Sequence, residues 1–426
     1  MRLDELIEEA KKAMPLQTKI HNKLSVVEGI TDNTNEVKEG YIFICVRGTR
    51  FDGHDFAEDM LDKGALCVVT EEDLGIENQI IVSDSRAFYG HLCAIWFNHP
   101  ERRMKLIGVT GTNGKTTLAT MIKDILASKG HRVGFIGTTG ALINGTPVET
   151  DGSTPTTPRV YELYKLFYEM AKTGCDCVVM EVSSFALEQN RIGPAMFRIG
   201  IFTNLAPDHI GPAEHKDFED YMRCKGLLFK QCRVGIVNAD DENYENVIAG
   251  HTCQIETFGF ADGADYRVED FGLIRGAGFL GIEFKAKGIL EMDVKVHAPG
   301  RFSVYNALCA IAVCHHFNVT KEQIQAAVID AKVKGRIEMV KVSDDFTLMI
   351  DYAHNAMSLE SLLTTLKEYE PKRLVCMFGC GGNRSKLRRY EMGEVSGKLA
   401  DLTVITSDNP RNEEPQDIID DIKTGI

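Results

Sequence analysis

Residues 106–117 have the sequence Leu106-Ile107-Gly108-Val109-Thr110-Gly111-Thr112-Asn113-Gly114-Lys115-Thr116-Thr117. The apolar start indicates a buried strand, and the pattern after the glycine-rich turn indicates a helix over 115–129. Glycines allow successive backbone N–H groups to point at phosphate oxygens. Lys115 would reach the outer phosphates, and the Thr116 hydroxyl would bind Mg²⁺. Val109 stands where the common pattern has its first glycine. The segment predicts a nucleotide-binding α/β domain, but it does not separate a hydrolase from a kinase or a ligase.

Composition excludes several classes of protein. The chain has 426 residues, 44% hydrophobic and 26% charged, which suggests a globular protein of about three domains. The net charge of −14 and the lack of a long Lys/Arg run argue against nucleic acid or an anionic membrane as a partner. No apolar run reaches the roughly 18 residues of a membrane span. The twelve cysteines lie mostly in apolar runs, which is typical of buried, reduced thiols in the cytoplasm.

The pattern of strands and helices divides the chain into three parts. Residues 1–100 predict a small α/β domain. Residues 101–334 predict a central, mostly parallel sheet with added antiparallel strands over 253–298. Residues 335–426 predict a third, Rossmann-like α/β domain. Because only about three strands fit in this last part, we expect that it is truncated and that the chain lacks its natural C-terminal end.

Three further side chains fall where a nucleotide site would need them. Glu181 follows the predicted strand 177–180 and His209 follows the predicted strand 199–202, and ligands bind at the carboxyl ends of such strands. Lys225 lies in a helical segment among apolar residues. Taken alone, each residue also fits an ordinary surface position, since isolated loop carboxylates, histidines and amphipathic lysines are common.

Together, these segments resemble the Mur ligase family, and most closely its UDP-N-acetylmuramoyl-tripeptide synthetases. The resemblance covers the whole chain and rests on Gly111-Thr112-Asn113-Gly114-Lys115-Thr116-Thr117, Glu181-Val182-Ser183-Ser184, Asp208-His209, Tyr221…Lys225, Asp351-Tyr352-Ala353-His354, Gly379-Cys380-Gly381-Gly382-Asn383-Arg384 and Asp408-Asn409-Pro410-Arg411.

The resemblance implies an ATP-dependent, ADP-forming amide ligase of peptidoglycan synthesis. Such an enzyme activates a carboxylate of UDP-MurNAc-L-Ala-D-Glu as an acyl phosphate, which a diamino acid then attacks. The implied cofactors are ATP and Mg²⁺. Aspartate, asparagine, proline and arginine at 408–411 favour meso-diaminopimelate, whose distal carboxylate suits a bidentate guanidinium.

The same resemblance assigns roles to individual residues. The implied catalytic residues are Lys115, Glu181, His209 and Lys225. The implied metal ligands are Thr116, Glu181, His209 and Lys225, the last as a carbamate. ATP contacts are implied for Gly111, Thr112, Asn113, Gly114, Lys115, Thr116, Thr117, Asn306, Arg336, Asp351 and His354. The implied contacts to the nucleotide-sugar peptide are Asn33, Thr49, Arg50, Thr156, Thr157, Ser183, Gln189 and Arg191, and those to the amino acid are Arg384, Asp408, Asn409 and Arg411.

The chain departs from the family pattern at several positions. Phe185 replaces a histidine after the two serines, Asn33 replaces a serine, and Asn383 and Ser385 flank Arg384 where aspartates are usual. The late Gly-Lys-Gly-His-Glu segment of the family is absent. Two other functions therefore stay open: a catalytically impaired paralogue that binds nucleotide-sugar peptide, and a ligase like folylpolyglutamate synthetase. We expect a cytoplasmic monomer whose domains open and close.

Overall fold

The computed structural model describes residues 1–21, 23–48, 51–152, 154–207, 210–211, 214–276, 278–329 and 335–426. Thr49, Arg50, Asp208 and His209 therefore lie outside the described residues. The chain forms two compact units, Met1–Asp265 with Ala312–Phe317, and Tyr266–Ile311 with Asn318–Ile426. The α/β class predicted from the sequence is confirmed, while the bounds of the three predicted domains stay predictions.

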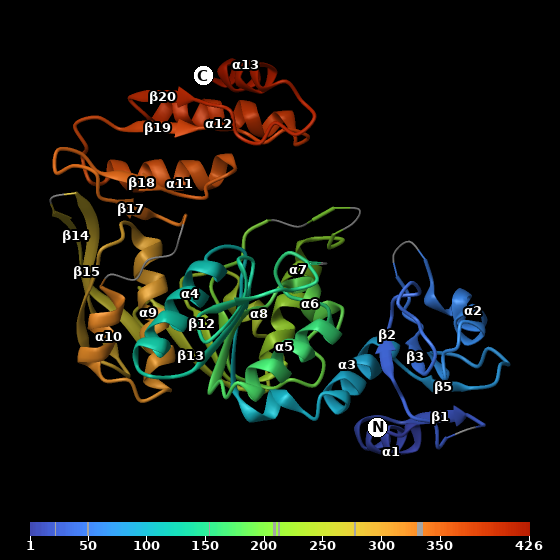
Figure 1. The fold of residues 1–426 in the computed structure, drawn as a ribbon. Coiled ribbons are helices and arrows are strands. Elements are labelled where there is room, and N and C mark those ends of the chain that lie inside the picture. The colour runs from blue at the N-terminus through green and yellow to red at the C-terminus, as the bar shows by residue number, and fades with distance from the viewer. Residues whose placement is uncertain are drawn as a thin grey trace. The chain divides into compact units, whose positions relative to one another are not determined.

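Figure 1 shows the ribbon, coloured from the N-terminus to the C-terminus. The central sheet of the first unit is built around β6 (Lys105–Thr110), which lies between β10 (Cys177–Glu181) and β11 (Phe197–Phe202). Both neighbours run parallel to β6, with Glu181 opposite Val109 and Phe202 opposite Thr110. Their carboxyl ends therefore meet at one edge of the sheet. The order in this unit is β13-β12-β11-β6-β10-β7-β8-β9. The other strands are β7 (Val133–Gly137), β8 (Gly140–Ile143), β9 (Thr146–Val148), β12 (Cys232–Asn238) and β13 (Gln254–Gly259).

Helices connect and cover these strands. The predicted helix after the glycine-rich turn is α4 (Lys115–Ser128), which buries Leu118, Ile122 and Ile125 at helical spacing and packs on β6, β7 and β10. The further helical elements of this sheet are η2 (Pro100–Arg103), α5 (Val160–Lys172), α6 (Ser184–Glu188), α7 (Phe218–Gly226), η3 (Leu227–Lys230) and α8 (Tyr244–Val247).

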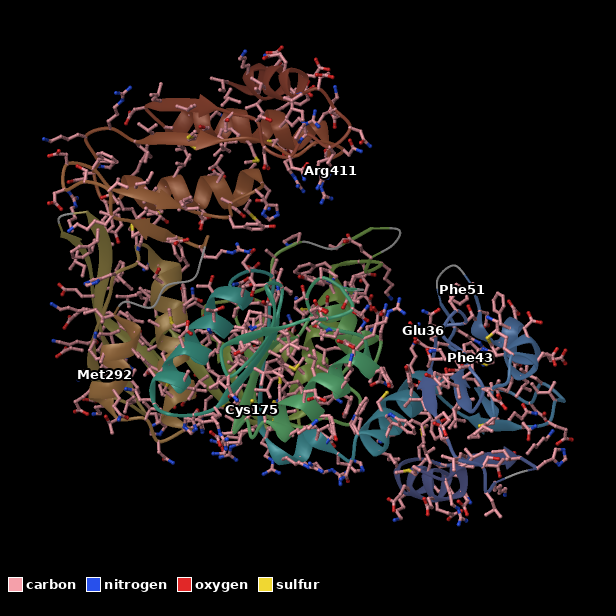
Figure 2. All side chains as sticks on the ribbon, in the orientation of Figure 1. Glu36, Phe43, Phe51, Cys175, Met292 and Arg411 are labelled. Carbon is pink, nitrogen blue, oxygen red and sulfur yellow. The ribbon has the colours of Figure 1, made fainter. Side chains whose placement is uncertain are left out.

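The first hundred residues form a second sheet in the same unit, with the order β1-β5-β4-β3-β2. Its strands are β1 (Leu16–Lys19), β2 (Gly29–Thr31), β3 (Tyr41–Ile44), β4 (Cys67–Thr70) and β5 (Gln79–Val82). Its helices are α1 (Leu3–Ala13), η1 (Gly53–Phe56), α2 (Ala57–Asp62) and α3 (Ser85–Trp96). Phe43 of β3, labelled in Figure 2, is fully buried in the core of this part.

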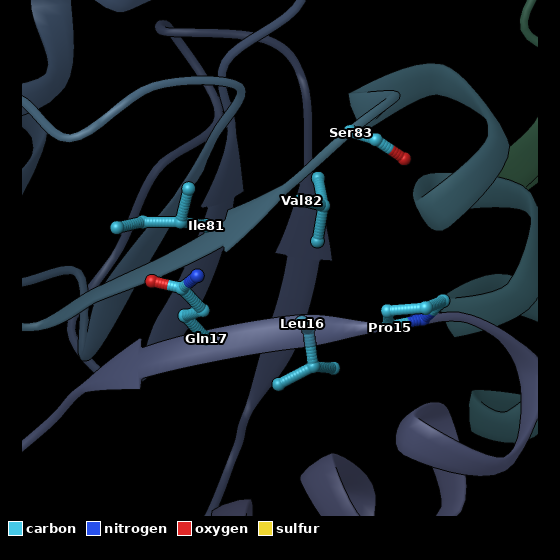
Figure 3. Close-up of a pocket in the computed structure, with 6 residues that line it drawn as sticks. All are labelled: Pro15, Leu16, Gln17, Ile81, Val82 and Ser83. Carbon is cyan, nitrogen blue, oxygen red and sulfur yellow. The ribbon is translucent and has the colours of Figure 1, made fainter.

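A depression of about 300 Å³ lies beside β1 and β5 (Figure 3). It is lined by Pro15, Leu16, Gln17, Ile81, Val82 and Ser83. None of these side chains carries a charge or a strong nucleophile, so the depression is no candidate for catalysis.

The second unit begins with the antiparallel strands expected over 253–298, although β13 within that range belongs to the parallel sheet. The remaining elements are β14 (Tyr266–Gly276), β15 (Phe279–Gly288), β16 (Met292–Val296), α9 (Arg301–His315), α10 (Lys321–Val328), β17 (Glu338–Val340), β18 (Leu348–Ile350), α11 (Ala356–Lys367), β19 (Val375–Phe378), α12 (Lys386–Leu399), β20 (Leu402–Ile405) and α13 (Pro415–Gly425).

The strands after residue 335 do not form one sheet. β18 forms an antiparallel pair with β17, and only β19 and β20 form a parallel pair. The alternation of strands and helices does not reveal this, because pairing depends on partners that lie elsewhere in the chain. Among the helices that the structure describes, none is both long and apolar enough to cross a membrane.

Candidate functional site

The glycine-rich turn is held in a loop that only glycine permits at two positions. Gly111 has φ +143°, and a Cβ atom there would lie 2.0 Å from Thr203 Oγ1. Gly114 has φ +84° and caps the start of α4. Lys115 Nζ donates to the Gly111 and Thr112 carbonyl oxygens, each at 2.9 Å. The lysine is thus held across the loop, in a position to reach an anion bound by the loop N–H groups.

Glu181, at the end of β10, faces the first turn of α4. Thr116 Oγ1 donates to Glu181 Oε2 at 3.0 Å, and Thr138 donates to the same carboxylate from its backbone N (2.9 Å) and from its hydroxyl (3.1 Å). The Glu181 side chain is fully buried. A carboxylate buried at such a position needs these donors, and it can exchange one of them for a cation.

The end of β11 supports the opposite side of the loop. Thr203 Oγ1 donates to the Asn113 carbonyl oxygen at 2.7 Å, and Asn204 Oδ1 accepts from the Asn113 N–H at 2.9 Å. The Thr112 N–H donates to the Asn204 carbonyl oxygen at 2.9 Å. The neighbouring strands therefore set the shape of the loop from both sides.

Lys225, on α7, is brought to the same loop. It is buried, its Nζ donates to the Gly111 carbonyl oxygen at 2.8 Å, and it lies 4.3 Å from the centre of the Tyr221 ring. Tyr221 Oη lies 3.2 Å from Thr112 Oγ1. The alternative, that Lys225 is an ordinary surface lysine, is wrong. Its role and that of His209, which lies outside the described residues, stay predictions.

The residues at this edge fit a magnesium ion. Thr116 and Glu181 supply a hydroxyl and a carboxylate 3.0 Å apart, and hard oxygen donors of this kind suit Mg²⁺. Lys225 ends beside the same loop, and as a carbamate it would add anionic oxygen donors, whereas the ammonium form cannot bind a metal.

The segment around Thr157 forms a rim next to Glu181. Thr157 Oγ1 donates to the Glu181 carbonyl oxygen at 3.0 Å and accepts from the Ser183 N–H at 3.0 Å. Ser183 Oγ in turn accepts from the Ala186 N–H at 3.2 Å and caps α6. Thr156 Oγ1 lies 3.2 Å from Thr138 Oγ1, beside a hollow of about 260 Å³ lined largely by Gly and Thr residues.

Arg191 and Gln189 lie on the same rim. Gln189 Oε1 accepts from Arg191 at 2.7 and 3.0 Å, and Arg191 Nη1 donates to the Thr157 carbonyl oxygen at 3.2 Å. Burial, together with the nearby Arg159 and Arg86 guanidinium groups, lowers the pKa of Arg191 to about 10. The structure thus brings together the rim residues expected on the central sheet.

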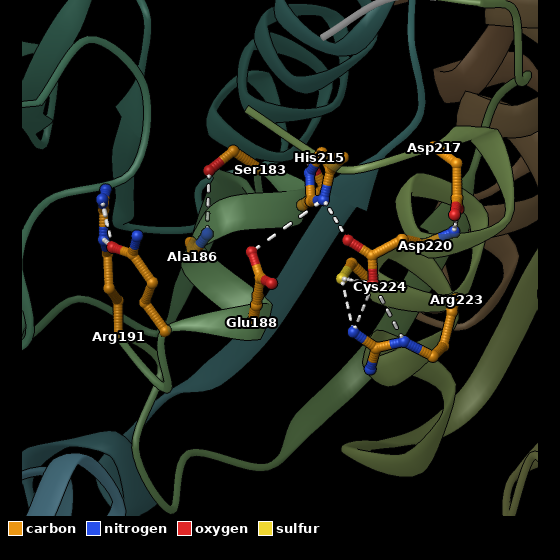
Figure 4. A network of polar contacts seen from close by, with 11 residues as sticks. Ser183, Ala186, Glu188, Arg191, His215, Asp217, Asp220, Arg223 and Cys224 are labelled. Atoms are coloured by element: carbon orange, nitrogen blue, oxygen red, sulfur yellow. Dashed lines mark hydrogen bonds and ion pairs between the residues drawn. The ribbon is translucent and has the colours of Figure 1, made fainter. Parts of the chain in front are cut away.

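A second polar network, shown in Figure 4, joins α6 to α7. His215 is buried, with Nε2 2.8 Å from Ser184 Oγ and Nδ1 3.2 Å from Asp220 Oδ2, and its ring stacks on Phe185. Glu188, His215, Asp220 and Cys224 together have the composition of a metal site. However, Arg223 already donates to Asp220 at 2.7 Å, and burial raises the pKa of the Cys224 thiol to about 12, so the network is better explained as structural.

The other expected contacts of the nucleotide-sugar peptide lie among the first hundred residues. Asn33 follows β2, and its side chain donates to Glu36 at 3.0 Å and accepts from the Asn35 N–H at 3.1 Å. Thr49 and Arg50 lie outside the described residues, so their predicted roles stay predictions.

In the second unit, three of the expected ATP contacts cluster around one turn. Asp351 accepts from the Ile337 N–H at 3.0 Å and from the Ala353 N–H at 2.8 Å, which ties the segments around β17 and β18 together. The Arg336 guanidinium lies 4.4 Å from the centre of the Tyr352 ring, and His354 Nδ1 lies 3.1 Å from the Tyr352 carbonyl oxygen. Asn306 lies on α9, half-buried.

The expected amino-acid contacts lie in two adjacent loops of the second unit, after β19 and β20. The Gly382 N–H donates to the Asn409 carbonyl oxygen at 2.9 Å, and Arg411 Nη1 donates to the Gly382 carbonyl oxygen. A Cβ atom at Gly382 would lie 1.8 Å from the Pro410 carbonyl oxygen. The loops that carry Arg384 and Asp408 are therefore packed against each other.

A buried arginine supports these two loops from behind. Arg389 donates to Glu413 at 2.7 Å and to Asp421 at 2.9 Å, and the Asn383 N–H also donates to Glu413. These contacts lower the pKa of Glu413 to about 2. Arg389, Glu413 and Thr138 were not among the site residues predicted from the sequence. Only Thr138 had a signal, since it follows a strand that ends at the same edge as β10.

Three segments of the chain match models of protein families. Residues 26–94 match "Mur ligase family, catalytic domain", residues 109–314 match "Mur ligase middle domain", and residues 335–426 match "Mur ligase, glutamate ligase domain".

Curated relatives match along most of the chain. UDP-N-acetylmuramoyl-L-alanyl-D-glutamate--2,6-diaminopimelate ligase 2 of Clostridium acetobutylicum is 38% identical over 405 residues, covering 94% of this chain and 83% of the relative. The UDP-N-acetylmuramoyl-L-alanyl-D-glutamate--2,6-diaminopimelate ligase of Clostridium perfringens is 37% identical over 413 residues, covering 94% of this chain and 83% of the relative.

Solved structures show the same fold. A UDP-N-acetylmuramoyl-L-alanyl-D-glutamate--2,6-diaminopimelate ligase superposes with a TM-score of 0.76 at 27% identity, covering 100% of this chain and 86% of the other. Mycobacterium tuberculosis folylpolyglutamate synthase has a TM-score of 0.61 at 17% identity, covering 78% of this chain and 82% of the other. At that identity the second match concerns the fold alone.

Proposed function

Because the chain belongs to the Mur ligase family, we propose that it is an ATP-dependent, ADP-forming ligase that adds meso-diaminopimelate to UDP-MurNAc-L-Ala-D-Glu. The observation that carries this proposal is the arrangement around the phosphate loop, where Lys115 lies across the loop and Glu181 contacts Thr116 at 3.0 Å. The curated relatives that bear this activity in their names support the choice of substrates.

The reaction needs a carboxylate to become an acylating agent. A carboxylate oxygen of the D-glutamyl residue attacks the γ-phosphorus of ATP, the bond to the bridging oxygen breaks, and ADP leaves. The incoming amine then attacks the acyl carbon, phosphate departs with the electron pair of the C–O bond, and the amine loses a proton. Both steps concentrate negative charge, which preorganised cations stabilise.

The chain's own residues would divide this work. The backbone N–H groups at 111–117 would hold the phosphates, and Lys115 would neutralise the charge that develops on them. Thr116 and Glu181 would hold a Mg²⁺ ion, and carbamylated Lys225 with His209 a second one. Bound Mg²⁺ supplies Lewis-acid stabilisation of the phosphate oxygens. Asn306, Arg336, Asp351 and His354 would complete the ATP site.

Two further sets of residues would bind the nucleotide-sugar peptide and the diamino acid. Thr156, Thr157, Ser183, Gln189 and Arg191 offer hydroxyl, amide and guanidinium donors to the nucleotide-sugar peptide, with Asn33, Thr49 and Arg50 on its uridine diphosphate. Arg384, Asp408, Asn409 and Arg411 would select the diamino acid, because a guanidinium binds a distal carboxylate in two places. We propose a cytoplasmic monomer; the twelve free thiols, eleven of them buried, are in keeping with the cytoplasm.

A phosphate-release assay tests the proposal. Turnover of ATP to ADP and phosphate is expected only when UDP-MurNAc-L-Ala-D-Glu and the amino acid are both present. Meso-diaminopimelate should support the highest rate among meso-diaminopimelate, lysine and ornithine. Release of AMP and diphosphate would contradict the mechanism. Binding of the nucleotide-sugar peptide without any turnover would instead favour an impaired paralogue, to which Phe185 and Ser385 point.

A further inference from the structure

Three arginines lie on three neighbouring elements of the first unit. Arg86 lies in the first turn of α3, Arg159 is the residue before α5, and Arg191 follows α6. Neither Arg86 nor Arg159 belongs to a motif predicted from the sequence. Arg191 is shared with the substrate rim described above.

Close packing fixes the three elements to one another. A Cβ atom at Gly90 of α3 would lie 2.7 Å from the Gly193 Cα atom, so the backbones of α3 and the segment after α6 touch. Tyr164 Oη of α5 donates to the Ile192 carbonyl oxygen at 3.2 Å. Each contact lies within five residues of one of the arginines. The backbone segments that carry the three arginines are therefore packed against one another.

The three guanidinium groups have little compensating charge. Within the described residues, none of the three forms an ion pair, and the hydrogen bonds recorded for Arg86 and Arg191 go to neutral oxygens of Arg47, Gln189 and Thr157. Asp32 is a carboxylate close enough to Arg159 and Arg86 for their charges to act on it. Burial raises the pKa of Asp32, and these two guanidinium groups lower it in part. Glu36, beside Asp32, is exposed. Two of the three cations, Arg159 and Arg86, thus act on one partly buried acid.

This arrangement is unfavourable for the protein alone. The proximity of Arg86 and Arg159 adds to the effect of burial in lowering the pKa of Arg191, which is a sign of mutual repulsion. Arg159 also occupies the N-cap of the 13-residue helix α5, where the helix dipole disfavours a cation and favours an anion. Charged side chains that destabilise a protein because they lack a compensating charge are typical of binding sites.

We propose that Arg86 and Arg159 form, together with Arg191, a binding site for an oxyanion of the nucleotide-sugar peptide. The inference rests on the proposed function, and it adds two residues and a chemical class of contact to it. Guanidinium groups bind phosphate and carboxylate oxygens in two places, and the substrate carries both kinds of group, in its diphosphate and in its glutamyl residue.

Calorimetric titration of the full chain with UDP-MurNAc-L-Ala-D-Glu tests the site. Arg159→Gln and Arg86→Gln should each weaken binding roughly 10- to 100-fold, as expected for the loss of a hydrogen bond to a charged group. Arg159→Lys should weaken binding less, because the charge is kept. Lys172→Gln is the matched control. It removes one charge from the opposite, exposed end of the same helix and should leave affinity within about twofold.

Thermal unfolding separates a binding role from a structural one. Arg159→Gln should unfold at the same temperature as the wild type or higher, because repulsion and the unfavourable N-cap charge are both relieved. A lower unfolding temperature together with weaker binding would overturn the inference, as would unchanged affinity in Arg159→Gln and Arg86→Gln. If the wild type binds no nucleotide-sugar peptide, the proposed function fails instead.

Two shorter probes identify which oxyanion is bound. UDP carries the diphosphate alone, and UDP-N-acetylmuramoyl-L-alanine lacks the glutamyl carboxylates. If Arg159→Gln weakens all three ligands by the same factor, the site holds the diphosphate. If it weakens only the ligand with D-glutamate, the site holds a carboxylate. In both cases, added salt should weaken binding to the wild type more than binding to Arg159→Gln.

Discussion

Substitution of Thr157 by valine should destabilise the protein and weaken its binding of the nucleotide-sugar peptide. The two side chains have nearly the same shape, so the change removes a hydroxyl and leaves packing intact. That hydroxyl donates to the Glu181 carbonyl oxygen and accepts from the Ser183 N–H, both at 3.0 Å, and Thr157 is 1% exposed. Two buried backbone groups would therefore lose their partner.

The size of the effect follows from these two contacts. An unsatisfied buried polar group costs about 1–3 kcal/mol, and partial relaxation or entry of a water reduces the sum, so we expect a loss of about 2–4 kcal/mol. For a domain of this size the corresponding fall in unfolding temperature is roughly 4–12 °C. Since Ser183 caps α6, its displacement should also raise the KM for the nucleotide-sugar peptide more than it lowers kcat.

Differential scanning calorimetry and steady-state phosphate release measure both effects. Thr156→Val is the matched control for stability, because among the described residues the Thr156 hydroxyl has one hydrogen-bond partner, the Thr138 hydroxyl, on a partly exposed rim. Thr157→Ser keeps the hydroxyl and should recover most of the stability. If Thr157→Val unfolds at the wild-type temperature with an unchanged KM, the reasoning from the two orphaned groups is refuted.

Three further outcomes are expected. Glu181→Gln keeps the shape of the carboxylate but not its charge, so turnover should fall at least about 100-fold and the Mg²⁺ concentration for half-maximal rate should rise; an unchanged magnesium titration would remove Glu181 from the metal site. Lys225→Ala should abolish turnover, and short carboxylic acids should restore part of it; wild-type rates without rescue would exclude the carbamate. Because the pKa of Glu413 is lowered to about 2, its contact with Arg389 should stabilise the second unit above pH 4.5. That contribution should be lost as the pH falls from about 4.5 toward 2. Glu413→Gln should flatten this part of the stability profile measured by chemical denaturation, and an unchanged profile would contradict the assignment.

Much of the site could be predicted from local pattern. The turn before α4 and the strand ends at Glu181 and Thr203 are encoded by apolar runs and glycines within a few residues of one another. Parallel strands bring such ends to one edge, so the contact between Thr116 and Glu181 follows from the strand order. The sequence did not reveal that β18 pairs with β17, because pairing is a choice between distant partners.

The sequence by itself determined the α/β fold, the phosphate loop and the family to which the chain belongs, since these depend on short-range periodicity and on ordered motifs. Only the tertiary structure decided that Lys225 is buried beside that loop and that Thr138 shares the Glu181 carboxylate. It also decided that α3, α5 and the segment after α6, which carry Arg86, Arg159 and Arg191, lie against one another. These residues are separated by tens of positions along the chain, and their side chains meet because helices and strands pack in one particular arrangement, which no local pattern records.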